Sequence, residues 1–104
     1  MNSRAKLNSK TLDEIKKELD PLCSYIIFRK EEATYRESDF SEILEILTEL
    51  KIIDVDWQVF SDESERRLLL VVKMKPQPND LAIQETLACR LSRDIGFLFY
   101  KKWP

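Results

Sequence analysis

Four short apolar stretches, separated by segments with helical periodicity, constrain the fold of this chain most strongly; they span residues 23–29, 53–60, 68–74 and 97–100. The first and third stretches would carry apolar side chains on both faces of an extended strand, which is typical of strands inside a sheet. The second alternates apolar residues with polar, mostly acidic ones, which is typical of a half-buried strand at an edge. A four-stranded sheet covered by helices is therefore predicted.

Three segments are predicted to be helical. Apolar residues recur at spacings of three and four over residues 11–19 and 39–50, and a third apolar stripe extends over residues 81–95. Thr11 and Glu14 have the spacing of a capping box, which would start the first helix. Gly96, the only glycine in the chain, follows the last stripe and is predicted to take the left-handed conformation that ends many helices.

The order of these elements predicts the fold class. After the first helix it reads strand, helix, strand, strand, helix, strand, which is the order of the ferredoxin-like fold. This α+β fold is a βαββαβ two-layer sandwich with an antiparallel four-stranded sheet in the order 4-1-3-2, so the first and third strands are central. The sequence thus predicts a flexible N-terminus over residues 1–9 and a single α+β domain over residues 10–104, with an extra N-terminal helix.

The composition limits the chemistry that this chain can perform. Histidine is absent, which removes the commonest general base and a common metal ligand, and one glycine is too few for a glycine-rich phosphate loop. No catalytic residue, metal site, cofactor or small-molecule ligand is identified, and the chain is interpreted as non-enzymatic. Asp54 and Asp56 share a strand face, but they are interpreted as solvated charges of an edge strand.

The cysteines and the apolar segments indicate the compartment. Cys23 and Cys89 are too few for a disulfide framework and are interpreted as reduced, partly buried thiols, with a bridge or a redox role as the alternative. The N-terminus shows no apolar signal core, and no stretch approaches the length of about 18 apolar residues that a membrane span needs. We therefore expect a cytoplasmic protein without membrane contact.

The sheet face that points away from the two long helices is predicted to be a protein-interaction surface. Its centre consists of Leu69 and Val71 of the third strand with one pair from the first, either Tyr25 and Ile27 or Ile26 and Phe28. An apolar centre with a charged rim is typical of interaction surfaces. We assign the site to Tyr25, Ile27, Leu69 and Val71 and expect self-association, as in a homodimer. The alternative is that the N-terminal helix covers this face within the same chain.

Nucleic acid is the alternative partner. Lys73 and Lys75, at the end of the third strand, and Lys101, Lys102 and Trp103, at the end of the fourth, form a modest basic and aromatic patch. Sheets of this topology can bind single-stranded RNA by stacking bases on exposed aromatic side chains. The formal net charge of −2 argues against a general attraction to nucleic acid, although a local patch can act against an acidic total.

Overall fold

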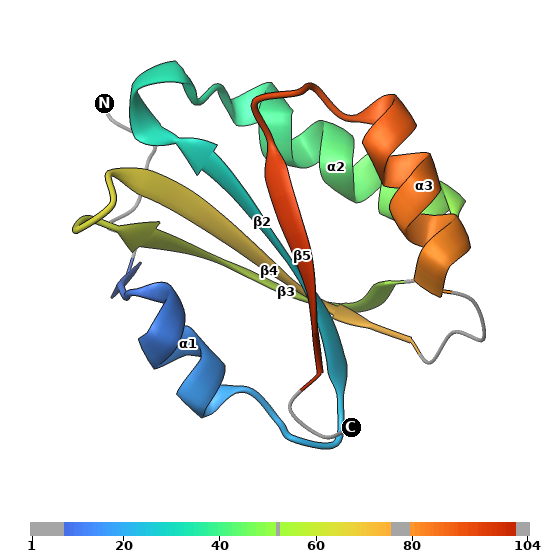
Figure 1. Cartoon of the computed structure of the whole chain (residues 1–104), viewed down its shortest axis with the longest axis horizontal. Coiled ribbons are helices and arrows are strands. Elements are labelled where there is room, and N and C mark those ends of the chain that lie inside the picture. Colours follow the sequence, from blue (N-terminus) through green and yellow to red (C-terminus); the bar gives the residue numbers. More distant parts are fainter. Residues whose placement is uncertain (1–7, 52, 76–79, 102–104) are drawn as a thin grey trace.

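The computed structural model describes residues 8–51, 53–75 and 80–101, which form a mixed five-stranded sheet and three α-helices (Figure 1). In chain order the elements are β1 (Asn8–Ser9), α1 (Leu12–Glu18), β2 (Ser24–Glu31), the short 3-10 helix η1 (Glu32–Thr34), α2 (Glu37–Glu49), β3 (Ile53–Asp62), β4 (Arg67–Met74), α3 (Asp80–Arg90) and β5 (Gly96–Lys101). The chain is therefore a small α+β protein, as the alternation of apolar stretches predicts.

The strands lie in the order β1-β3-β4-β2-β5. The two strands predicted to be central, β2 and β4, pair with each other over eight residues and lie inside the sheet. β3 pairs with β4, and β5 with β2, and both pairings are antiparallel. The sheet is nevertheless not the purely antiparallel, four-stranded one that the sequence predicts, because β1 adds in parallel to the outer edge of β3, with Asn8 opposite Phe60.

No sequence pattern predicts β1, because its two residues are polar and too few to alternate. A backbone hydrogen bond from Lys10 N to Ser61 O, 3.0 Å long, continues the pairing by one residue. Asn8 and Ser9 belong to the N-terminus predicted to be flexible, and here they form a paired strand. Residues 1–7 lie outside the described part of the chain.

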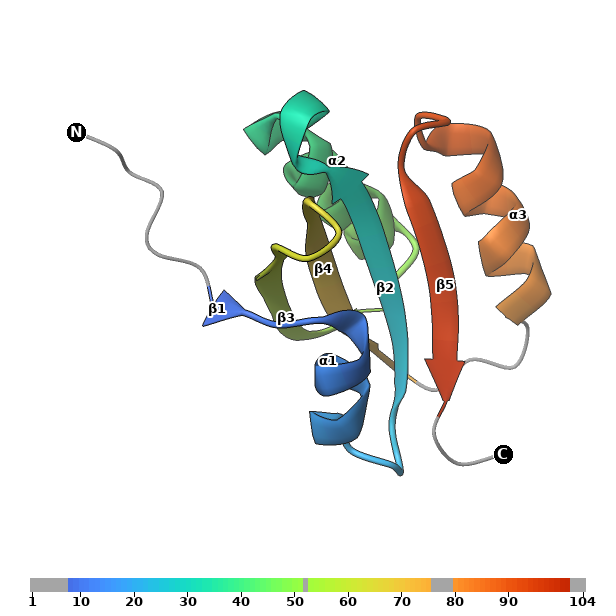
Figure 2. The same cartoon turned by 60° about the vertical axis from the view of Figure 1, so that its left-hand side comes forward.

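Two apolar cores lie on opposite faces of the sheet. The larger lies between the sheet and helices α2 and α3 and includes Ile26, Phe28, Phe40, Ile43, Leu47, Leu68, Leu70, Val72, Met74, Ile83 and Leu87. The smaller lies under α1, on the opposite face (Figures 1 and 2). Successive residues of β4 alternate between the two cores, which confirms the predicted orientation of this strand.

The backbone at the helix ends corrects the prediction for Gly96. Helix α3 ends at Arg90, and Gly96 begins β5 without a positive φ, so the predicted left-handed conformation is wrong. The left-handed residue at a helix end is Lys51, with a φ of 58°, directly after the C-cap Leu50 of α2. A lysine there is strained, because its Cβ approaches the backbone.

We expect Lys51→Gly to raise the free energy of unfolding by about 0.5–1 kcal/mol, because glycine adopts the left-handed conformation without this strain. Urea unfolding followed by circular dichroism measures the change. Lys51→Ala removes the same charge but keeps Cβ, so this control should not be stabilised. A glycine variant less stable than the wild type would contradict the prediction.

A buried lysine joins β2, the start of α2 and the loop between α3 and β5. Lys30 is 4% exposed, and its Nζ lies 2.6 Å from Asp94 Oδ2 and 3.5 Å from Asp39 Oδ2. Asp39 Oδ2 also accepts a hydrogen bond of 2.8 Å from the backbone N of Arg36, which caps α2. Asp94 Oδ1 accepts one of 2.6 Å from Ser92 Oγ. The buried charge is therefore compensated on both sides.

This cluster should make stability sensitive to acid. The hydrogen bond from Lys30, and then that from Ser92, lowers the pKa of Asp94 from 3.8 to about 2. Because the folded-state pKa is below the unfolded value, the contribution of Asp94 is complete above about pH 4 and is lost as the pH falls toward 2. We expect the urea midpoint of the wild type to fall more steeply over this range than that of Asp94→Asn. Parallel curves for the two proteins would refute this assignment.

Candidate functional site

The four residues predicted to form a protein-interaction site lie together on one sheet face, where α1 covers them. Tyr25, Ile27, Leu69 and Val71 are 8%, 1%, 1% and 5% exposed. They form a single cluster with Ile15 of α1. Figures 1 and 2 show this helix on the side of the sheet opposite to α2 and α3. A helix of the same chain thus occupies this face, which is the alternative to a partner that the sequence left open.

Helix α1 binds this face because its apolar residues form one stripe. Ile15 is buried in the cluster, and Leu12 and Leu19 pack against it with part of their surface exposed. The predicted capping box starts the helix: Glu14 N donates to Thr11 Oγ1 at 3.2 Å, and Thr11 N donates to Glu14 Oε1 at 2.9 Å. A helix of seven residues has little stability alone, so the packing of its apolar stripe stabilises it.

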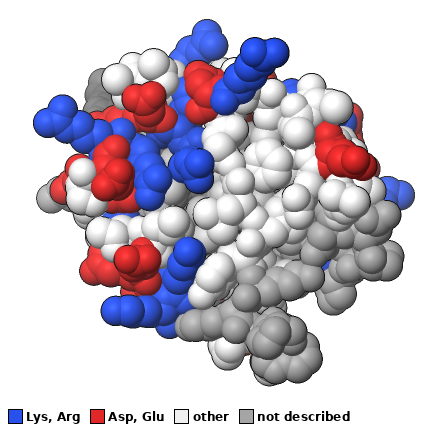
Figure 3. Space-filling model, viewed as in Figure 1, with Lys and Arg blue, Asp and Glu red and all other residues white. Residues whose placement is uncertain are grey.

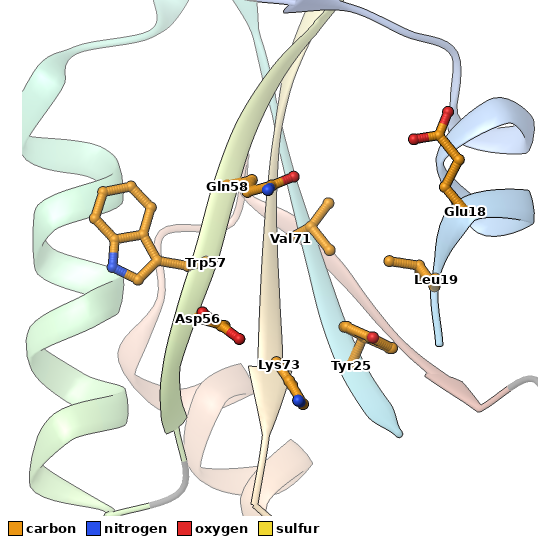
Figure 4. Close-up of a pocket in the computed structure, with 8 residues that line it drawn as sticks. All are labelled: Glu18, Leu19, Tyr25, Asp56, Trp57, Gln58, Val71 and Lys73. Atoms are coloured by element: carbon orange, nitrogen blue, oxygen red, sulfur yellow. The ribbon is translucent and has the colours of Figure 1, made fainter. Parts of the chain in front are cut away.

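A hollow of about 300 Å³ lies between the C-terminal end of α1 and the sheet (Figure 4). Its walls are formed by Glu18, Leu19, Tyr25, Asp56, Trp57, Gln58, Val71 and Lys73. Leu19 faces Val71 and Tyr25, whereas the indole of Trp57 points toward α2, on the other side of the sheet (Figure 4). The hollow thus combines two predicted protein-contact residues, Tyr25 and Val71, with Lys73, a predicted nucleic-acid residue.

The phenol of Tyr25 in the hollow is poorly suited to proton transfer. The hydroxyl of Tyr25 accepts a hydrogen bond of 3.1 Å from Asp20 N, and burial raises the pKa of this phenol, so it stays neutral at physiological pH. A phenol that does not ionise near neutral pH is a poor general base. Over residues 8–51, 53–75 and 80–101, no three cysteine, aspartate or glutamate side chains are placed to hold a metal ion.

Three of the predicted nucleic-acid residues, Lys73, Lys75 and Lys101, lie at one end of the sheet. Ser24, the first residue of β2, is opposite the end of β4 on one side and the end of β5 on the other. The structure thus brings both strand ends beside the start of β2. Lys75 is exposed, whereas Lys73 is partly buried beside the hollow. Lys101 ends β5, and residues 102–103 lie outside the described residues.

The two edges of the sheet differ in how their backbones are protected. At one edge of the sheet, β1 covers β3 only at Phe60 and Ser61, so the rest of β3 forms the edge. The pairing of β3 with β4 is irregular between Ile53 and Trp57. Asp56, which is exposed, lies within the irregular stretch. Natural sheets prevent pairing between molecules by covering an edge strand, by bulges in it and by charged side chains on it. β3 is therefore a protected edge.

The opposite edge strand, β5, has no covering strand and no bulge in the part of the chain that the structure describes, and its one charged residue, Lys101, stands at its end. It pairs in regular register with β2, from Gly96 opposite Arg29 to Lys101 opposite Ser24. Residues 96–100 are uncharged, and each is partly exposed. Figure 3 shows uncharged surface over β5 in the centre of the view, with charged side chains gathered to its left. Over residues 96–100, β5 is therefore an unprotected edge. The predicted strand order places this strand at an edge but does not show that it is unprotected.

The chain matches no protein-family model, no curated protein and no solved structure. Among the helices of the described segments, none has both the length and the apolar character needed to cross a membrane. The two cysteines are free thiols, with Cys23 partly buried and Cys89 exposed on α3.

Proposed function

We propose that this chain is a non-enzymatic protein-interaction domain that self-associates through the edge of β5, built on a ferredoxin-like βαββαβ core to which β1 and α1 are added. The observation that carries the proposal is the contrast between the protected edge β3 and the unprotected edge β5. An uncharged edge strand presents backbone N–H and C=O groups that a strand of another molecule can pair. The order β3-β4-β2-β5, with antiparallel pairing throughout, supports the proposed core.

A second copy of the chain is the partner that this edge favours. Antiparallel pairing of β5 with β5 of the copy is symmetric and closes into a dimer that leaves only the protected edges free. Pairing of β5 with β3 of the next copy would instead extend without end. The presence of β1, the irregular register of β3 and the exposed Asp56 oppose that arrangement.

We expect the chain to have the mass of a dimer in light scattering after size-exclusion chromatography, and Tyr100→Glu to lower this mass to that of a monomer. Lys16 Nζ lies 5.2 Å from the centroid of the Tyr100 ring, so the fold offers a cation beside the new carboxylate. A charge on the edge strand would oppose pairing between copies. Gln58→Glu adds one carboxylate to the opposite edge strand and, as the matched control, should remain dimeric.

Two outcomes would overturn this proposal. One is a wild-type chain that stays monomeric at high micromolar concentration, and the other is equal dissociation of the Tyr100 and Gln58 variants. Hydrogen exchange provides a second measurement that does not depend on a substitution. Protection of the β5 amides should fall on dilution if the edge is paired between copies, and unchanged exchange would count against the dimer.

Binding of single-stranded nucleic acid is the second candidate function. The convergence of the ends of β4 and β5 beside Ser24, where the sequence has Lys73, Lys75 and Lys101, favours it. We expect the double variant Lys75→Ala, Lys101→Ala to weaken salt-dependent binding of a fluorescent oligonucleotide. No binding by the wild type at low salt would exclude this candidate.

A further inference from the structure

A second cavity, of about 400 Å³, lies at the end of β2 and β4 opposite to the hollow. Three arginines from separate segments line it: Arg29 of β2, Arg67 at the start of β4, and Arg93 in the loop between α3 and β5. Only the tertiary structure brings these three segments together, and their spacing in the sequence forms no motif. The cavity does not overlap the hollow beside α1.

The only glycine of the chain leaves room for Arg29 in this cavity. A Cβ at position 96 would lie 2.7 Å from Arg29 Nε and 2.8 Å from its Cζ, so the guanidinium rests directly on the backbone of β5. Glycine weakens a strand, and here no positive φ requires it. What glycine provides at position 96 is therefore the space that the side chain of Arg29 occupies.

The guanidinium groups of the cavity have hydrogen-bond donors available for a ligand. Arg67 Nε donates a hydrogen bond of 3.1 Å to Asp62 Oδ2, and Asp62 is 1% exposed. A buried carboxylate therefore positions this arginine. Its terminal nitrogens form no hydrogen bond with a residue that the structure describes. The guanidinium groups of Arg29 and Arg93 likewise have no hydrogen-bond or ion-pair partner among residues 8–51, 53–75 and 80–101.

Carboxylates on the same wall restrict the class of ligand. Asp94 already accepts hydrogen bonds from Lys30 and Ser92. Glu31 and Glu65 are exposed and have no ion-pair partner within the described ranges. Guanidinium groups bind phosphate through paired hydrogen bonds, whereas carboxylates repel a second anionic group and accept hydrogen bonds from hydroxyls. The two kinds of group together suit a molecule with one phosphate and several hydroxyls.

We propose that this cavity binds a small phosphorylated polyol, such as a sugar phosphate. Arg29, Arg67 and Arg93 hold the phosphate, and Glu31 and Glu65 accept hydrogen bonds from the hydroxyl groups. The cavity volume lies within the range of small-molecule sites. The inference is independent of self-association, because its donors and acceptors are side chains and not the backbone edge of β5.

Titration of the ¹⁵N-labelled chain with ribose 5-phosphate, followed by NMR, tests the proposal. We expect saturable shifts of amides around the cavity, weaker binding of inorganic phosphate, and no binding of ribose over the same concentrations. Arg29→Gln and Arg93→Gln should each weaken the binding of ribose 5-phosphate about tenfold. Arg36→Gln removes an exposed arginine that does not line this cavity, and this matched control should bind as the wild type does.

Two further variants test the geometry and the choice of ligand. Gly96→Ala displaces Arg29 without removing a charge, so it should weaken binding as Arg29→Gln does, and the same spectra show whether the variant is folded. Glu31→Gln should reduce the preference for ribose 5-phosphate over phosphate. The proposal fails if ribose 5-phosphate causes no saturable shift, if it binds no more tightly than phosphate, or if Arg36→Gln weakens binding as much as Arg29→Gln.

Discussion

Leu69→Asp is expected to lower the free energy of unfolding by about 4 kcal/mol and to leave much of the chain unfolded at 37 °C. Leu69 is 1% exposed in the core under α1, where its neighbours are apolar. A carboxylate there would lose its hydration and gain no compensating cation. Thermal unfolding followed by circular dichroism, with proton NMR for residual structure, measures the loss.

The matched control for this variant is Gln58→Asp. Gln58 is exposed, and it is opposite Val71 in the pairing of β3 with β4. The same carboxylate at this solvated position should change stability by about 0.5 kcal/mol or less. A Leu69→Asp variant that stays fully folded but has a different oligomeric mass would contradict this prediction. It would show that a partner, and not α1, covers this face.

Lys30→Met is expected to cost about 3 kcal/mol, the second largest effect. The methionine can fill much of the space of the lysine, but the carboxylate of Asp39, with a side chain 9% exposed, would lose its cation. Removal of one member of a buried ion pair is costly because the other charge remains out of water. Chemical unfolding of the variant, compared with the wild type at pH 7, measures this cost.

A double variant separates the charge effect from a general packing defect. Lys30→Met combined with Asp39→Asn should lose less stability than the sum of the two single variants, because no uncompensated charge remains buried at Asp39. Arg90→Met is the control, since Arg90 and Glu49 form an ion pair of 2.8 Å with side chains 44% and 61% exposed. Such surface pairs contribute about 0–1 kcal/mol. Additive losses in the double variant would refute the buried-charge explanation.

Local patterns predicted the elements of this fold well. The two-sided apolar stretches became the interior strands β2 and β4, and the alternating stretch became the edge-side strand β3. Thr11 and Glu14 form the predicted capping box. These predictions succeeded because the alternation of apolar side chains and the spacing of a capping box each involve only a few neighbouring residues. The prediction for Gly96 failed because α3 already ends at Arg90, so Gly96 starts the strand β5 instead of capping a helix. The space beside Gly96 is occupied by Arg29, which is a contact between strands that the local spacing does not predict.

The candidate sites depended on contacts between segments far apart in the sequence. Tyr25, Ile27, Leu69 and Val71 were correctly predicted to share a face, but their exposure depended on where α1 lies. The predicted strand order correctly placed the last strand at an edge of the sheet, but it did not show that β3 is covered and β5 is not. The arginine cavity was not predicted, because it forms only where β2, the start of β4 and the α3–β5 loop meet.

The amino-acid sequence by itself determined the three α-helices and the strands β2, β3, β4 and β5, and which sides of β2 and β4 are apolar, because these properties follow from local periodicity. Only the tertiary structure decided that α1 closes the second face, that β1 protects β3 while β5 stays open, that Lys30 is buried, and that Arg29 lies against Gly96. The physical reason is that burial and strand pairing depend on contacts between segments that are distant in the sequence. Hydrophobicity alone shows that an apolar face needs a cover, whereas packing geometry decides whether a helix or a partner provides it.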